Sequence, residues 1–194
     1  KKWFYGIILI ICLCVGGFCA YQAWQIYNED NQAELQTDKI KKDYVEKKSE
    51  NGEQILNPDW DALKAINPDI VGWIYVPDCA ISYPVVHGTN NSYYLDHTIY
   101  KGYNFMGSAF LDCDTNSDFS DDNSIIYGHS VHGGGMFTLL KNFSSKSFFE
   151  SHNDFYLLTP DQNYKCNVFC YSKSNNESLF YAKDFGGERQ DTLD

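Results

Sequence analysis

One histidine in this sequence has a local context suited to acid–base chemistry. His129 follows the apolar, β-branched run at residues 124–127 and is followed at once by a glycine-rich loop, in the stretch SIIYGHSVHGGGMF. A histidine at the end of a strand can exchange protons near neutral pH. His129 is therefore the candidate general acid or base, with a structural, hydrogen-bonded role as the alternative. The remaining histidines lack such a context and are expected to be surface or hydrogen-bonded residues: His87, His97, His132 and His152.

A cysteine could join such a histidine in acyl transfer, because a thiolate is an effective nucleophile. Three of the seven cysteines lie in the apolar N-terminal segment, and the others form no C-x-x-C pair or zinc-ligand spacing. We therefore expect no disulfide framework, metal or cofactor. Cys166 and Cys170 are four residues apart, which in one strand places both on the same face. A buried pair of free thiols is expected there, with Cys170 as the alternative that could face an exposed site.

An acidic stretch, DCDTNSD at residues 112–118, is similar to the beginning of a calcium-binding loop. The central glycine and the glutamate at the twelfth position are missing, and Asn123 stands at that position. An acidic surface loop is expected. A calcium-responsive protein that uses the cluster from Asp112 to Asp122 remains a weaker alternative.

The chain carries a net charge of −11, so the phosphate backbone of nucleic acid is an unsuitable partner. Residues 1–27 carry two lysines and then no charged residue until Glu29, which is enough apolar chain to cross a bilayer as a helix. We interpret 1–27 as a transmembrane signal anchor with a cytoplasmic N-terminus and an extracellular domain. A cleaved signal peptide, or a lipid-modified Cys19, is the alternative.

The rest of the chain divides into a polar segment and a folded domain. Residues 28–52 have mixed charges and a weak helical pattern, which predicts a solvated helical stalk that ends near Asn51-Gly52. Residues 53–194 begin with a short helix capped by Asp59 and continue as short strands between turn signals. Such a pattern, with 15 Tyr and 13 Phe in the chain, predicts a β-barrel or sandwich.

Several blocks of the sequence, taken in order, resemble the class B sortases, membrane-anchored cysteine transpeptidases of Gram-positive bacteria. The segment from Leu56 to Asp112 resembles the opening block of that family, with N-P-D-x-V-G-W, then I-x-Y-P-V-V, then Y-Y-L. SIIYGHS resembles the catalytic-histidine motif, and GGGMFTLLKNF is similar to the segment after it.

The resemblance implies an eight-stranded β-barrel with N-terminal helices, and it gives His129 the role of the catalytic histidine. In the family a cysteine thiolate attacks a sorting-signal peptide of a surface protein. An amine of a cell-wall precursor, or of another protein, then resolves the acyl-enzyme, and an arginine holds the substrate carbonyl or the oxyanion. The implied partners are therefore the sorting-signal peptide, the precursor amine and the bacterial membrane.

The sequence departs from the family in one respect. The family's cysteine lies in a T-L-x-T-C strand, and its arginine lies on the following strand; neither motif is present in these residues. Cys166 and Cys170 correspond to an earlier strand, and Arg189 precedes the expected cysteine, so neither role is transferred. The sequence predicts an incomplete barrel that is cut in the loop before the cysteine strand. Such a chain would be inactive by itself; the alternative is a non-catalytic, membrane-anchored module that binds sorting signals or wall precursors.

Overall fold

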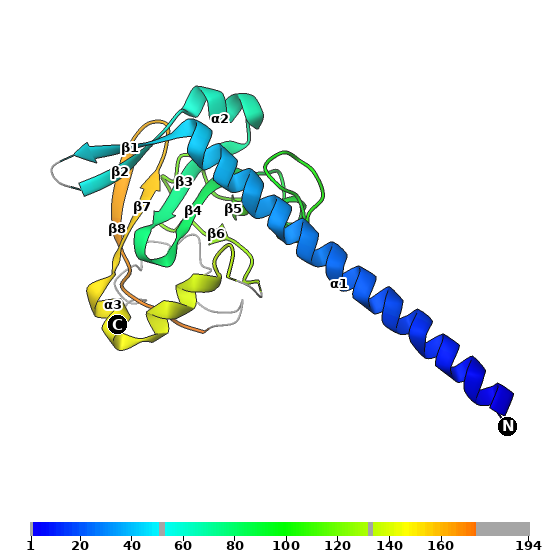
Figure 1. Ribbon diagram of the computed structural model, residues 1–194. Coiled ribbons are helices and arrows are strands. Elements are labelled where there is room, and N and C mark those ends of the chain that lie inside the picture. Colours follow the sequence, from blue (N-terminus) through cyan, green and yellow to red (C-terminus); the bar gives the residue numbers. More distant parts are fainter. Residues whose placement is uncertain (1, 51–52, 132–133, 174–194) are drawn as a thin grey trace.

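A computed structural model of the chain describes residues 2–50, 53–131 and 134–173 (Figure 1). The elements, in chain order, are α1 (Lys2–Tyr44), β1 (Val45–Glu50), β2 (Glu53–Pro58), α2 (Trp60–Ile66), β3 (Ile70–Val76), η1 (Pro77–Cys79), β4 (Ile81–His87), η2 (Tyr93–Leu95), β5 (Ala109–Leu111), β6 (Ile126–Tyr127), η3 (Thr138–Ser144), α3 (Lys146–Ser151), β7 (Asp154–Leu158) and β8 (Asn163–Asn167). The predicted short helix and short strands are confirmed in this order.

The domain is built on one curled sheet of six strands in the order β6-β5-β4-β3-β7-β8. All neighbouring strands are antiparallel except β4 and β5, which are parallel. The sheet has the shape of half a barrel, which agrees with the predicted sortase-like barrel class. Within the described residues the sheet ends at β6 on one side and at β8 on the other.

Both faces of the sheet are covered, and the two central strands are buried almost throughout. Trp73 of β3 lies fully buried in the core on one face, together with Leu63 of α2, and its indole N–H donates to Ser82 Oγ at 3.0 Å. Ile74, the next residue along β3, belongs to the core on the other face, with Phe143 of η3. Successive strand residues point to opposite faces, so one strand supplies both cores.

The short helix α2 forms as its sequence predicts. Asp59 is its N-cap, and the Asp59 carboxylate accepts a hydrogen bond from the Ala62 N–H at 3.1 Å. Leu63 is fully buried, with Trp60 and Ile66 packed beside it. The Asp59 N–H donates to the carbonyl of Tyr44 at 2.8 Å, which places α2 against the C-terminal end of α1.

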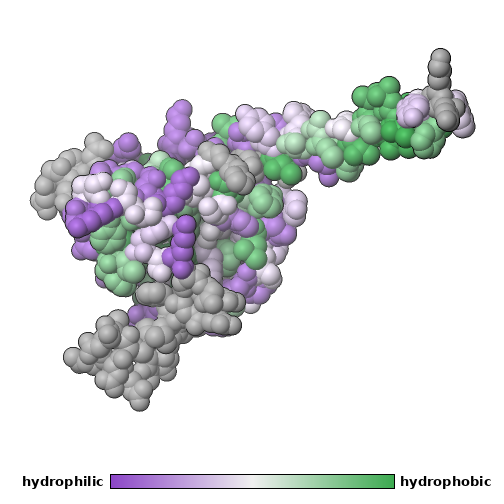
Figure 2. Space-filling model, turned by 90° about the horizontal axis from the view of Figure 1, so that it is seen from below, coloured by the Kyte–Doolittle hydropathy of each residue, from purple (hydrophilic) through white to green (hydrophobic). Residues whose placement is uncertain are grey.

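The segment predicted to be a solvated stalk differs from that prediction in two ways. The helix ends at Tyr44, and Val45–Glu50 is strand β1, paired antiparallel with β2. In addition, Ala33 and Ile40 are buried against the domain. These two residues are seven positions apart and lie on one face of the helix. The second half of α1 is therefore part of the domain, while the apolar first half projects away from it (Figures 1 and 2).

A proline within the apolar run AISYPVV predicts an edge strand or a bulge at Pro84, because a proline has no N–H to donate to a neighbouring strand. That prediction is wrong for the strand as a whole, because β4 lies in the interior of the sheet. Pairing of β4 with β5 begins at Val85, one residue after Pro84, whereas Pro84 itself pairs with Trp73 of β3. The proline, which has no N–H to donate, thus stands at a position with a single paired neighbour.

Candidate functional site

His129 lies immediately after β6, in a narrow loop that returns on itself before η3. The Phe137 N–H donates to the carbonyl of His129 at 3.0 Å, and Ser130 and Met136 form an isolated bridge. Gly128 is required by this packing, because a Cβ there would lie 2.7 Å from the ring of Phe137. The backbone of His129 is therefore fixed at the base of the glycine-rich loop.

The imidazole ring of His129 is held by the loop that follows β4. Its Nε2 lies 2.7 Å from the carbonyl oxygen of Leu95 on η2, and the ring of Phe105 packs against it with centroids 5.7 Å apart. A carbonyl oxygen only accepts hydrogen bonds, so Nε2 carries a proton. In the neutral ring, Nδ1 is then the nitrogen that can take up or release a proton.

The Leu95 carbonyl is itself fixed by a close approach of the backbone at Gly107. This glycine has φ +58°, and a Cβ there would lie 2.5 Å from the Leu95 carbonyl oxygen and 2.3 Å from that of Tyr94. Only glycine fits such a site. The sequence did not identify Leu95, Phe105 or Gly107 as neighbours of His129. Leu95 belongs to the Y-Y-L block, but nothing in that block indicates a contact with a residue 34 positions further along the chain.

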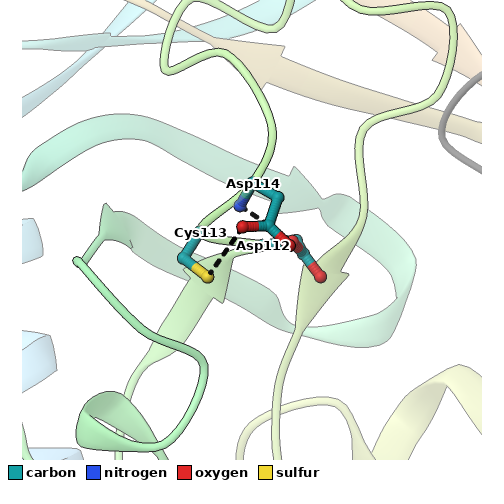
Figure 3. A group of neighbouring side chains, drawn as sticks. All are labelled: Asp112, Cys113 and Asp114. Atoms are coloured by element: carbon teal, nitrogen blue, oxygen red, sulfur yellow. Dashed lines mark hydrogen bonds between the residues drawn. The ribbon is translucent and has the colours of Figure 1, made fainter.

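The acidic stretch after β5 forms a hydrogen-bonded turn instead of an open carboxylate cluster (Figure 3). Asp112 is only 2% exposed. Its carboxylate accepts hydrogen bonds from Asn91 Nδ2 at 3.0 Å, from the Tyr127 hydroxyl at 2.8 Å and from the Asp114 N–H at 3.0 Å. Asp112 thus ties the loop after β4 to β6, the strand that precedes His129.

The side chains of Asp112, Cys113 and Asp114 lie within 4.8 Å of one another, so calcium binding can be tested directly. The three hydrogen bonds that Asp112 accepts satisfy its carboxylate within the protein. We therefore expect the melting temperature to stay the same when millimolar calcium is added, as measured by circular dichroism with magnesium as the control. A calcium-specific rise in melting temperature would contradict this interpretation.

The two late cysteines do not form the buried pair predicted from their spacing. Strand β8 ends at Asn167, so only Cys166 belongs to it; Cys166 is partly buried, and Cys170 lies beyond the strand and is exposed. The prediction of one shared strand face is wrong, because the chain leaves the sheet between the two residues. Burial raises the pKa of the Cys166 thiol, against a smaller opposing effect of the Leu157 backbone. Its neutral, unreactive form is favoured.

Two of the remaining histidines are hydrogen-bonded, as predicted: His97 Nδ1 lies 2.8 Å from the carbonyl of Tyr93, and His152 Nδ1 lies 2.7 Å from Ser151 Oγ. His97 stacks on Tyr93 with ring centroids 4.1 Å apart, and His152 stacks on Phe148 at 4.4 Å. His87, the last residue of β4, differs from the prediction, because its Nε2 is buried and has no hydrogen-bond partner among the described residues. His132 and Arg189 lie outside the described residues.

No protein-family model matches the chain. Individual relatives do. Sortase B of Listeria monocytogenes is 30% identical over 183 residues, which cover 90% of this chain and 73% of the relative. A class B sortase of Streptococcus pyogenes involved in pilus biogenesis is 36% identical, with a TM-score of 0.62 over 69% of this chain and 75% of the other.

A third comparison covers more of this chain than the Streptococcus pyogenes structure does. The Staphylococcus aureus sortase B–substrate complex is 26% identical, with a TM-score of 0.72 over 85% of this chain and 77% of the other. The chain belongs to the class B sortases.

Proposed function

We propose that this chain carries the histidine half of a sortase active site and that His129 is its catalytic histidine. The observation that supports the proposal is the contact of His129 Nε2 with the Leu95 carbonyl. It orients the ring and leaves Nδ1 for proton transfer. The class B sortase relatives support a transpeptidase reaction on a sorting-signal peptide, and one of them is a substrate complex.

In the proposed reaction a cysteine thiolate attacks the carbonyl carbon of a Thr–Gly-type bond in the sorting signal. The C–N bond breaks, the leaving amine takes a proton from the His129 imidazolium, and the substrate remains on sulfur as a thioester. An amine of a cell-wall precursor then attacks the thioester, the thiolate leaves, and the proton of the amine returns to His129. An arginine would stabilise the oxyanion.

The nucleophile of this reaction is not found among these 194 residues, which contain no T-L-x-T-C segment. We therefore propose that the 194-residue chain does not cleave peptide by itself and that cleavage requires a cysteine strand from outside these residues. The second candidate function is a binding module for sorting signals or wall precursors without chemistry. The absence of a T-L-x-T-C segment from these residues is consistent with such a binding module.

We further propose that α1 anchors the domain in the bacterial membrane. It is long and apolar enough to cross a bilayer, and its first half is exposed in the structure. Lys1 and Lys2 precede the apolar stretch, which favours a cytoplasmic N-terminus and an extracellular domain by the positive-inside rule.

The proposal is tested with a quenched fluorescent sorting-signal peptide and two proteins: the 194-residue chain, and the same chain extended by a T-L-x-T-C strand and the arginine strand of a relative. We expect the extended protein to cleave the peptide and to form a thioester adduct, detected by mass spectrometry, and we expect the 194-residue chain to do neither. Thiol-dependent cleavage by the 194-residue chain that is lost in Cys170→Ala would show that the nucleophile lies within these residues. Binding without cleavage by both proteins would favour the binding module.

A further inference from the structure

The exposed apolar side chains of the domain are concentrated in one segment. Beyond α1, the large hydrophobic residues that are exposed in the described part of the chain fall between residues 93 and 105, apart from Phe169. They are Tyr93, Leu95, Tyr100, Tyr103 and Phe105. A gathering of apolar surface of this kind marks an interaction site more often than a scatter of single residues does.

The loop from Thr98 to Phe105, which we call the aromatic loop, lies beside α1 (Figure 1). A hollow between them is lined by Asn28, Gln32 and Gln36 of α1 and by Tyr100 and Tyr103 of the loop. At about 1.5 Å per helical residue, Gln32 lies only about 8 Å along the axis from Tyr27. Since the uncharged stretch of α1 continues to Asn28, the aromatic loop lies close to the end of the membrane-spanning segment.

The two ends of the aromatic loop lie side by side, because the Thr98 N–H donates to the Gly102 carbonyl at 2.9 Å and His97 forms an antiparallel bridge with Tyr103. The Tyr100 hydroxyl lies near Tyr44 and Asp43, at the C-terminal end of α1. Burial raises the pKa of Tyr100, and the charges of these two neighbours raise it further. Ile99 and Ile40 likewise lie together in the core. Tyr103, by contrast, is 69% exposed, and Phe105 is 49% exposed. The exposed parts of the Tyr103 and Phe105 side chains can therefore contact a surface outside the domain.

The surface expected next to the aromatic loop is the lipid headgroup layer of the membrane. A bilayer is about 40–45 Å thick with its headgroups and about 30 Å without them, so each headgroup layer extends about 5–7 Å beyond the hydrocarbon. Tyrosine is favoured in this layer, because its ring is apolar and its hydroxyl remains hydrated. Trp24 and Tyr27 of α1 are also exposed, and they lie about 12 Å and about 8 Å along the helix axis before Gln32. The only lysine of the loop, Lys101, lies 3.0 Å from Asp69 and so has a carboxylate partner within the domain.

We infer that Tyr103 and Phe105 rest in the headgroup layer as a second contact of the domain with the membrane. The inference depends on the proposed membrane anchoring of α1. It has a consequence for the site, because the ring of Phe105 packs against the ring of His129. A loop that is fixed at the lipid surface places His129 next to that surface and restricts rotation of the domain about the axis of α1.

The test places one 19F reporter, 4-trifluoromethylphenylalanine, at a single position of the full chain in phosphatidylcholine nanodiscs. The positions are Tyr103 and Phe105 for the inference, and Trp24 for the membrane span. Ala65 is the distant control, because it is exposed on α2, which joins the far end of α1, about 26 Å beyond Tyr27. Transverse relaxation is measured with and without a lipid that carries a nitroxide on its headgroup.

We expect strong relaxation enhancement at Trp24, Tyr103 and Phe105 and little at Ala65. A reporter at Tyr100, on the same loop but directed toward Asp43, should respond less than the one at Tyr103. Enhancement at Trp24 together with equal, weak values at Tyr103 and Ala65 would overturn the inference and leave membrane anchoring intact. No enhancement at Trp24 would overturn the anchoring itself and the inference with it.

Discussion

Replacing His129 with alanine, in the chain extended by a cysteine strand, is expected to lower the rate of peptide cleavage by a factor of about 10²–10⁴. The variant would lose the group that protonates the leaving amine and accepts the proton of the incoming one. His129 lies just beyond the end of β6, and its ring contacts Leu95 and Phe105. The loss should therefore appear in kcat, measured with the quenched peptide, with little change in the melting temperature.

The matched control for this variant is His152→Ala. His152 is the C-cap residue of α3 and stacks on Phe148, outside the contacts of His129. Its replacement is expected to leave kcat and KM unchanged. Wild-type kcat in His129→Ala would refute the role of this histidine. A fall in the melting temperature of His129→Ala that His152→Ala does not share would instead attribute the loss of rate to folding.

Replacing Trp73 with alanine is expected to lower the free energy of unfolding by about 3–5 kcal/mol. Trp73 is fully buried at the centre of β3, where it packs between the sheet and α2, and its removal leaves a large cavity. Small domains are stable by about 5–15 kcal/mol in total. Urea denaturation followed by circular dichroism should therefore show a midpoint at a much lower urea concentration.

Ser82→Ala separates the two contributions of the tryptophan. It removes the partner of the indole N–H and leaves the ring in place, so a loss of about 1 kcal/mol is expected. If Trp73→Ala were no more destabilising than Ser82→Ala, the core around β3 would not be the main source of stability.

Some features of the fold could be predicted because their causes are local. The cap of α2 depends on one side chain and a backbone N–H three residues later, so Asp59 was identified from its type and position. The strand Ile70–Val76 is a short apolar run directly before Pro77, which is a local pattern typical of a strand. His129 stood out because a strand ends and glycines begin within a few residues of it.

Other features depend on partners that are distant in the sequence. The burial of Ala33 and Ile40 against the domain is decided by the surface that α1 meets, so a weak helical pattern was interpreted as a solvated stalk. The position of Pro84 in an interior strand depends on where β5 starts to pair. The separation of Cys166 from Cys170 depends on where β8 leaves the sheet. Spacing within one segment contains none of this information.

The sequence by itself determined the family, the candidate histidine and the apolar segment at the N-terminus. The family follows from short motifs in a fixed order along the chain, and the other two follow from residues close together. The tertiary structure decided which nitrogen of His129 faces the protein and that Asp112 holds a turn. It also decided that the aromatic loop lies beside α1. Each of these depends on side chains and carbonyl groups from separate elements, which meet only when the sheet curls and the helix packs against it.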